Sequence, residues 1–291
     1  MTRYDSKQLN PPSNSRLLIV HADDLGQAHS INDASIKALD MGLVSSGSIM
    51  VPCPWFAEIA AYARLHTHAD LGIHLTLTSE WSTYRWKPIL SPHVVPTLVD
   101  SYGCFHRRWS ESTVINADEV EAEIRAQIEL ALACGIQPTH LDSHELKLYK
   151  VHEDLFEVLR RVSQDYQLPI PIARNWLDTW EHLRRSTHSS DFVIERAICI
   201  PNETSPDNWT AFYTEVVKKM PSGITQIIVH LAHDNEEMRG IAKGCRSYGA
   251  TWRQRDFDFF TSELFSQLLE QQAITLVNWR QISQYLLNSK Q

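Results

Sequence analysis

Residues 17–26 read LLIVHADDLG, an apolar run that ends in polar residues. A short apolar run with polar residues at its end is typical of a buried strand. Asp23 and Asp24 follow this run after His21 and Ala22, although neighbouring carboxylates repel and are costly to bury without partners. The stretch therefore predicts a strand whose C-terminal end opens onto a functional site.

Similar apolar runs recur along the chain and alternate with helical patterns. Strands are expected at 16–20, 44–51, 71–77, 138–143, 169–173, 224–230 and 273–278, with 192–200 as a weaker candidate that also fits a helix. Helices are expected at 29–41, 55–65, 117–135, 152–165, 207–219, 258–272 and 279–288. This alternation predicts an α/β protein, and the number of units favours a parallel (β/α) barrel of about seven strands over an open doubly wound sheet.

The chain is expected to hold one domain. Residues 1–15 are polar and are expected to form a flexible N-terminal extension, and residues 16–291 to form a single barrel domain. Two stretches, 79–116 and 231–253, lack clear periodicity. A loop as long as the first of them is usually functional inside a compact domain.

Composition narrows the class of protein. The formal net charge of −8 argues against nucleic acid as a partner, because phosphate binding needs a basic surface. The five cysteines are scattered and odd in number, which indicates free thiols in a reducing compartment. No apolar stretch is long enough to span a membrane, and no signal peptide is recognised. The expectation is a soluble cytoplasmic protein without membrane contact.

Polar residues gather at the ends of several expected strands. In a parallel barrel these ends meet on one face, where active sites are built. Besides the two aspartates, the residues concerned are His74, His140, Asp142, His144, Arg174 and His230. Together they suggest one divalent metal ion held by two histidines and one carboxylate, for which Zn²⁺ ranks above Mg²⁺ on ligand chemistry.

Each of these residues also has a structural explanation when it is taken alone. The aspartate pair could cap a helix, and His74 could be a hydrogen-bonded core histidine. The run HLDSH at 140–144 is more specific, because alternation puts its polar side chains on one face of a strand. Arg174 could be a structural ion-pair partner, and His230 cannot be told from His233 as the functional histidine.

The motifs LLIVHADDLG, LGIHLTLT, PTHLDSHE and IIVHLAHD occur in the order found in the YdjC-like carbohydrate deacetylase family, which the chain resembles over roughly residues 16–285. That family includes chitooligosaccharide deacetylases. The resemblance implies a distorted, polysaccharide-deacetylase-like barrel of parallel strands with one divalent metal ion. It implies a hydrolase that removes an N-acetyl group from an amino sugar or oligosaccharide.

The resemblance also implies roles for individual residues. Asp24, His74 and His144 match the metal ligands, Asp23 the catalytic base, and His230 a candidate general acid. The residues expected to orient these groups or to bind substrate are His140, Asp142, Arg174, His233, Trp81 and Trp86. The chain departs from the family at His21, where Asn is common, and at Leu231, where proline is usual.

Other interpretations of the same residues remain. One is a metal-dependent amide or ester hydrolase that acts on a non-sugar substrate. Another is a non-catalytic sugar-binding relative, which the presence of both aspartates disfavours. The sugar, its chain length and linkage, the native metal and the oligomeric state are left open, although a homodimer is plausible.

Overall fold

The computed structural model describes residues 14–109, 113–189, 191–245 and 247–288, and its strands pair in parallel. The main sheet has seven strands in the order β4-β3-β2-β1-β8-β7, and β9 also pairs with β1. Strands β5 and β6 form a separate two-stranded sheet. The bounds are β1 Arg16–Leu25, β2 Ser46–Ile49, β3 Leu71–Leu75, β4 Leu141–Ser143, β5 Ile172–Ala173, β6 Val193–Ile194, β7 Arg196–Cys199, β8 Gly223–Val229 and β9 Ile274–Leu276.

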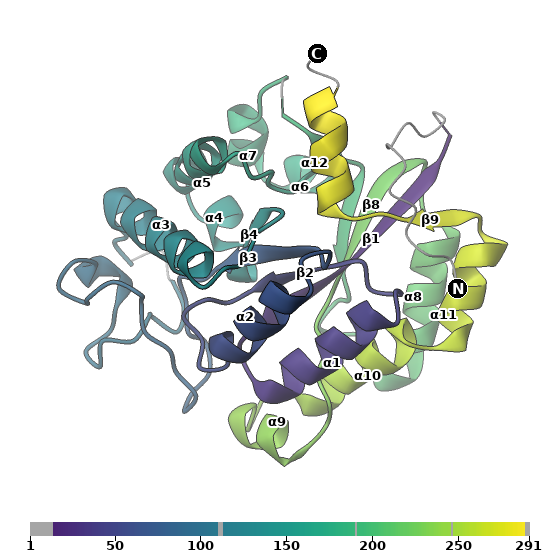
Figure 1. The fold of residues 1–291 in the computed structure, drawn as a ribbon, viewed down its shortest axis with the longest axis horizontal. Coiled ribbons are helices and arrows are strands. Elements are labelled where there is room, and N and C mark those ends of the chain that lie inside the picture. The colour runs from purple at the N-terminus through teal and green to yellow at the C-terminus, as the bar shows by residue number, and fades with distance from the viewer. Residues whose placement is uncertain (1–13, 110–112, 190, 246, 289–291) are drawn as a thin grey trace.

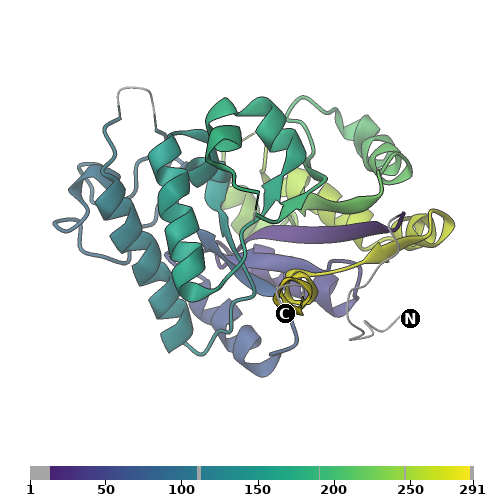
Figure 2. The ribbon, with the colours of Figure 1, turned by 90° about the horizontal axis from the view of Figure 1, so that it is seen from above.

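Helices surround this sheet (Figures 1 and 2). Helices α3 and α5 lie on one side of it in Figure 1, and α8 and α11 lie on the other. The bounds are α1 His29–Asp40, α2 Phe56–Leu65, α3 Ala117–Ala133, α4 Lys147–Lys150, α5 Glu153–Tyr166, α6 Arg174–Thr179, α7 Glu181–Ser186, α8 Trp209–Lys218, α9 Glu236–Ile241, α10 Ala250–Phe260, α11 Glu263–Gln271 and α12 Trp279–Asn288.

Strand β1 is the centre of the sheet. Leu18, Ile19 and Val20 are fully buried, which explains why the strand reads as a continuous apolar run. One edge of β1 pairs with β8 along 16–22. The other edge pairs with β9 over 16–18 and with β2 from His21 onward. The aspartate pair therefore lies near the C-terminal end of the central strand.

The sheet curls into a half-barrel, and the segment 169–175 bridges its edge strands β4 and β7. The amide of Leu141 donates to the carbonyl of Pro169, which joins β4 to the segment before β5. The side chain of Asn175 pairs with both backbone groups of Ala197 on β7, at 2.9 and 3.0 Å, as a neighbouring strand would. The predicted distorted parallel α/β barrel is confirmed. The distortion is that β4 and β7 do not pair with each other and are bridged by these hydrogen bonds instead.

Several element boundaries differ from the sequence prediction. The first strand was expected to end at residue 20 but continues to Leu25, so the aspartates lie inside it. The segment 192–200 forms two short strands, β6 and β7, in different sheets. The segment 231–253, expected to be irregular, contains α9 and the start of α10. Its glycines suppressed the helical pattern, because glycine is unfavourable inside helices.

Two further expectations concern the ends of the chain and membranes. Most of the expected extension, residues 1–13 of 1–15, lies outside the described residues. Within the part of the chain that the structure describes, no helix is long and apolar enough to cross a membrane.

Candidate active site

The ends of four parallel strands bring the predicted residues together. Parallel strands have their carboxyl ends at the same edge of a sheet, so polar residues at those ends become neighbours. The side chains that meet are Asp23 and Asp24 of β1, His74 of β3, Asp142 of β4, and His144 and His230, which directly follow β4 and β8.

An irregularity in β1 lets both aspartates face the same site. The pairing of β1 with β2 shifts register between Ala22 and Leu25. Asp24 has a φ of 70°, a left-handed conformation that aspartate tolerates better than most residues. As a result, Asp23 Oδ2 lies 3.8 Å and Asp24 Oδ1 lies 3.5 Å from His74 Nε2. In a regular strand, neighbouring side chains would point to opposite faces.

Asp24, His74 and His144 are arranged as ligands of one ion. Asp24 Oδ1 lies 3.5 Å from His74 Nε2 and 3.2 Å from His144 Nδ1. Ligands at about 2.1 Å from one tetrahedral ion lie about 3.4 Å apart. Asp24 Oδ1 and His74 Nε2 are buried and make no hydrogen bond, which is costly unless another group binds them. These buried residues therefore fit a divalent metal ion.

Carboxylates orient both histidines of this set. Asp142 Oδ1 lies 2.8 Å from His74 Nδ1, and Glu80 Oε2 lies 3.0 Å from His144 Nε2. Each contact fixes one ring nitrogen as a donor, which leaves the other nitrogen free to bind a metal. Burial alone would lower the pKa of His144, but Glu80 and Asp24 outweigh it and raise the pKa to about 10.

Other groups of buried histidine and acidic residues satisfy the same spacing. They are His21 with His140 and Asp142, Asp23 with His74 and Asp142, and Glu80 with His144 and Glu145. In the first two of these groups, Asp142 already accepts hydrogen bonds from His74 and His21. The third lies at the exposed side of His144, where Glu145 accepts a hydrogen bond from Thr78. In the Asp24 group, the unbonded atoms Asp24 Oδ1 and His74 Nε2 lie 3.5 Å apart.

Arg253 of α10 fixes the remaining oxygen of Asp24. Its Nη2 donates to Asp24 Oδ2 at 2.6 Å, and its Nε donates to the carbonyl of Tyr248 at 2.8 Å. Burial alone would raise the pKa of Asp24, but the charge of Arg253 and contacts with His144 and His74 hold it well below its usual value. Sequence reasoning missed Arg253 because it assigned 231–253 to an irregular stretch.

Asp23 and His230 face each other across the site. Asp23 Oδ2 lies 3.8 Å from His230 Nε2. The backbone amide of His230 donates to Asp256 of α10 at 3.0 Å, and its ring packs edge-on against Tyr248. Burial lowers the pKa of His230 to about 4, against the opposing charges of Asp24 and Asp23. His230 is therefore neutral at rest.

The chain turns sharply directly after His144. Glu145 and Leu146 have φ values of 53° and 55°, which are unusual for non-glycine residues. Strain of this kind persists where surrounding contacts enforce it, and it is frequent at functional sites. Here, the turn lets His144 leave β4 and face Asp24.

Three of the predicted residues lie away from the Asp24 group. His140 is fully buried and stacks on Trp279. Arg174 is 59% exposed in its side chain and pairs with Glu195. His233 pairs with Asp33 at 3.0 Å, so His230 is the histidine of that motif that reaches Asp23.

Trp81 and Trp86 are buried side chains of the segment 79–109, which forms the blue loops beside α3 in Figure 1. Trp86 Nε1 donates to the carbonyl of Thr78, and Arg85 donates to Asp100. These contacts hold the segment in place next to His144, where it supplies Glu80. Sequence reasoning missed Glu80, for which no periodic signal exists.

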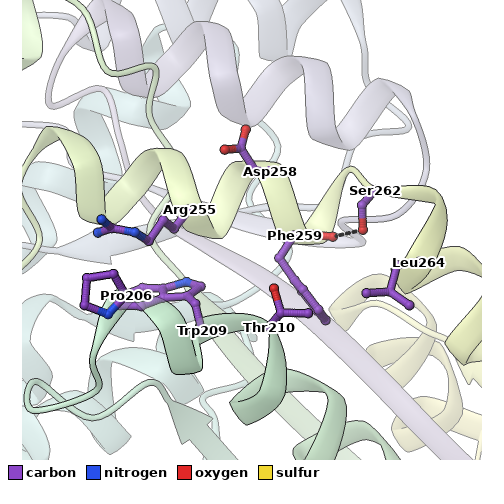
Figure 3. Close-up of a pocket in the computed structure, with 8 residues that line it drawn as sticks. All are labelled: Pro206, Trp209, Thr210, Arg255, Asp258, Phe259, Ser262 and Leu264. Atoms are coloured by element: carbon purple, nitrogen blue, oxygen red, sulfur yellow. Dashed lines mark hydrogen bonds between the residues drawn. The ribbon is translucent and has the colours of Figure 1, made fainter.

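A separate surface pocket lies between α8, α10 and α11 (Figure 3). Its lining includes Trp209, Arg255, Asp258 and Leu264. None of the predicted site residues lines it. Trp209 is linked to the site only indirectly, through Asp256, which accepts from both Trp209 Nε1 and the backbone of His230.

The fold and the site define a class, namely α/β barrel proteins with a buried histidine–aspartate group suited to a metal ion. Within that class, the chain belongs to the family described as YdjC-like protein, whose sequence model matches residues 17–271.

Named relatives and a solved structure agree with this assignment. A carbohydrate deacetylase from Thermus thermophilus is 31% identical over 84% of this chain and 85% of its own length. A carbohydrate deacetylase from Enterococcus faecalis is 26% identical over 92% of this chain and 99% of its own length. A crystal structure from Enterococcus faecalis V583, provisionally named a cellobiose-phosphate cleavage protein, has a TM-score of 0.77 at 26% identity and covers 92% and 99% of the two chains.

Proposed function

We propose that this protein is a metal-dependent carbohydrate deacetylase, a hydrolase that removes an N-acetyl group from an amino sugar or oligosaccharide. The observation that carries the proposal is the pair of buried, unbonded atoms Asp24 Oδ1 and His74 Nε2, which face each other at 3.5 Å. The names of full-length relatives supply the substrate class. Two imidazoles and one carboxylate with an open position are the usual ligands of a catalytic zinc ion.

Asp24, His74 and His144 would hold the ion, and Zn²⁺ is favoured over Mg²⁺. Mg²⁺ prefers oxygen ligands and keeps several waters, whereas two of these three ligands are imidazole nitrogens. When bound, such an ion supplies a Lewis acid for the acetyl carbonyl and lowers the pKa of a bound water.

Asp23 and His230 would move the protons. Asp23 lies beside the ligands without being needed as one, so it would accept a proton from the attacking water. His230 would deliver a proton to the departing amine while acetate leaves with the water oxygen. Because His230 is neutral at rest, it must first receive the proton that it delivers to the amine. Asp23 Oδ2, which lies 3.8 Å from His230 Nε2, would pass on the proton taken from the water.

The decisive experiment measures acetate release from a panel of N-acetylglucosamine mono- and oligosaccharides, with and without a chelator. We expect release that stops on chelation and returns with added Zn²⁺. Simple N-acetyl amides and acetyl esters serve as the matched non-sugar panel. Release from those alone would replace the sugar with another substrate, and release that persists in chelator would exclude metal dependence.

A second experiment tests the role of Asp23. Asp23→Asn keeps the size of the side chain but removes the base, so we expect unchanged metal content and a loss of turnover of about 100-fold or more. Asp24→Ala should instead lose metal, as measured by elemental analysis. An active Asp23→Asn protein would exclude Asp23 as the base.

We further propose that residues 16–291 act as one domain in the cytoplasm. The five cysteines are free, which fits a reducing compartment. Fractionation of the source cells would test the location, and size-exclusion chromatography would distinguish a monomer from the proposed homodimer.

A further inference from the structure

His21 lies at the bottom of the site and has no part in the mechanism above. Its ring is fully buried on β1, beside the β2 residues Ser46 and Ser48. Its Nε2 lies 2.9 Å from Asp142 Oδ2 and 3.3 Å from Asp23 Oδ1. One ring nitrogen therefore touches both the proposed base and the carboxylate that orients a proposed metal ligand.

The hydrogen bonds around Nε2 require it to carry a proton. Ser48 donates its own proton to Asp142 Oδ2 at 2.9 Å, so its oxygen, 3.2 Å from His21 Nε2, faces the ring as an acceptor. The other neighbours of Nε2 are carboxylate oxygens, which only accept when ionised. On the far side of the ring, Nδ1 lies 3.0 Å from the hydroxyl of Ser46.

The charges around Asp142 require a cation. Asp142 is buried, and a buried carboxylate without a compensating charge is strongly destabilising. Its contact with His74 is through Nδ1, so His74 stays neutral when its Nε2 binds a metal. Among the described residues, no lysine or arginine forms an ion pair with Asp142 or Asp23, which leaves His21 as the group that can carry the charge.

The remaining titratable groups near His21 agree with this assignment. His140 lies edge-on to it at a ring distance of 5.0 Å, and burial together with the charge of His21 lowers the pKa of His140. Asp70 lies beyond Ser46, and its charge interaction with His21 is attractive. Burial alone would lower the pKa of His21, but Asp142 and Asp23 outweigh it and raise the pKa to about 9.

We propose that His21 is a positioning residue that stays doubly protonated at neutral pH and holds Asp23 and Asp142 as oriented carboxylates. The imidazolium forms an ion pair with Asp23 Oδ1 at 3.3 Å, and Oδ2 then faces His74 and His230. Through Asp142 it also keeps the Nδ1 proton of His74 in place. The effect on Asp23 rests on the proposed function, whereas the charge of His21 is independent of it.

The first test needs no substrate. Long-range ¹H–¹⁵N correlation spectra of the zinc-loaded protein report the protonation of each histidine ring nitrogen, and His21→Gln assigns the His21 signals. We expect both nitrogens of His21 to be protonated from pH 6 to pH 8. A neutral ring with one unprotonated nitrogen at pH 7 would overturn the proposal, whether or not the protein proves to be a deacetylase.

The second test uses His21→Gln, which keeps a donor near Nε2 but removes the charge. Loss of the charge that orients Asp23 should lower kcat for acetate release per bound zinc ion by about 10-fold or more, because a small misplacement of a reacting group can cost about 100-fold. We expect an unchanged KM. Exposed His93→Gln is the matched control and should keep the wild-type kcat.

A merely structural role for His21 predicts a different outcome. Loss of packing would lower zinc content or raise KM and leave kcat per bound zinc ion unchanged, which contradicts the proposal. If no sugar is deacetylated by the wild-type protein, the proposed function fails, and the spectra alone then decide the charge of His21.

Discussion

At the scale of single residues, Asp24 shows how the site divides the work of one carboxylate. Oδ2 is held by Arg253, and Oδ1 faces two histidine nitrogens without a hydrogen bond. The left-handed backbone at Asp24 turns this side chain to the same side as Asp23. The two adjacent carboxylates thus have different partners. Asp24 contacts Arg253 and the two histidines of the proposed metal site, whereas Asp23 contacts His21 and His230.

The ion pair between Arg253 and Asp24 leads to a stability prediction. Arg253→Met leaves a buried carboxylate with an uncompensated charge, so the free energy of unfolding in chelator should fall by about 3–5 kcal/mol. Denaturant titration measures this change. Arg255→Met on the same helix is the control, because that half-buried side chain stacks over Trp209 and donates to the carbonyl of Thr251, without a buried carboxylate partner, and should cost about 1 kcal/mol or less. Equal losses in the two variants would contradict the prediction.

At the scale of elements, the segment 79–109 and helix α10 complete the site. The segment 79–109 supplies Glu80 to His144, and α10 supplies Arg253 to Asp24 and Asp256 to the backbone of His230. The strands place the reacting residues, whereas these two elements orient them.

The contact between Glu80 and His144 predicts a loss of metal affinity. Glu80→Gln keeps the shape of the side chain but replaces a carboxylate that raises the basicity of His144, and loss of such a partner typically lowers metal affinity 10–100-fold. Competition with a zinc chelator measures the affinity. Glu145→Gln is the matched control, since Glu145 bonds Thr78 and Lys147 instead. An unchanged affinity in Glu80→Gln would show that the segment only packs against the site.

Asp256 of α10 predicts a pH dependence of stability. Burial raises its pKa to about 6, against hydrogen bonds from His230, Tyr213 and Trp209 that lower it. The native state therefore holds this proton more tightly than the unfolded state, and wild-type stability should fall as pH rises from about 4 to about 6. The side chain introduced by Asp256→Asn has no proton to lose in this pH range. The free energy of unfolding of the variant minus that of the wild type should therefore rise by up to about 3 kcal/mol from about pH 4 to about pH 6.

Urea titrations at several pH values measure this difference, which is insensitive to other titrating groups because both proteins share them. If the amide introduced by Asp256→Asn destabilises the protein equally at every pH, the stability difference shifts by a constant and its slope against pH does not change. A difference that stays flat between pH 4 and pH 6 would contradict the raised pKa of Asp256.

The elements also explain how far the sequence could predict the site. Asp23, Asp24, His74, His144 and His230 stand at the ends of apolar strands, so period-two patterns and the parallel topology were enough to group them. Arg253 and Glu80 were missed because they reach the site from a helix with a weak apolar pattern and from a loop. Contacts of that kind depend on tertiary packing, which leaves no local signal. The strand pattern likewise could not show that β1 continues through the aspartates.

At the scale of the whole molecule, the barrel has continuous strand pairing on one side and only scattered hydrogen bonds on the other. Strands β8, β1, β2, β3 and β4 pair continuously, whereas β4 and β7 are joined by β5, β6, one backbone hydrogen bond and the amide of Asn175. The proposed ligands come from β1, from β3 and from the residue after β4, on the continuous side. A bound ion would therefore tie three neighbouring strands together where buried polar atoms now lack partners.

This geometry predicts that metal removal lowers the stability of the whole barrel. An ion that binds only the native state stabilises it by about 4 kcal/mol when free metal is 1,000 times the dissociation constant, so the Tm should fall on chelation and rise again with the logarithm of added Zn²⁺. Calorimetry or thermal fluorescence measures the shift. His144→Ala removes a ligand without leaving Arg253 unpaired, and its Tm should no longer respond to the chelator. His233→Ala removes a histidine that pairs with Asp33 outside the ligand group, so its Tm should respond as the wild type does. A chelator response that survives in His144→Ala would place the stabilising ion elsewhere, with the groups around His21 or Asp23 as the next to test.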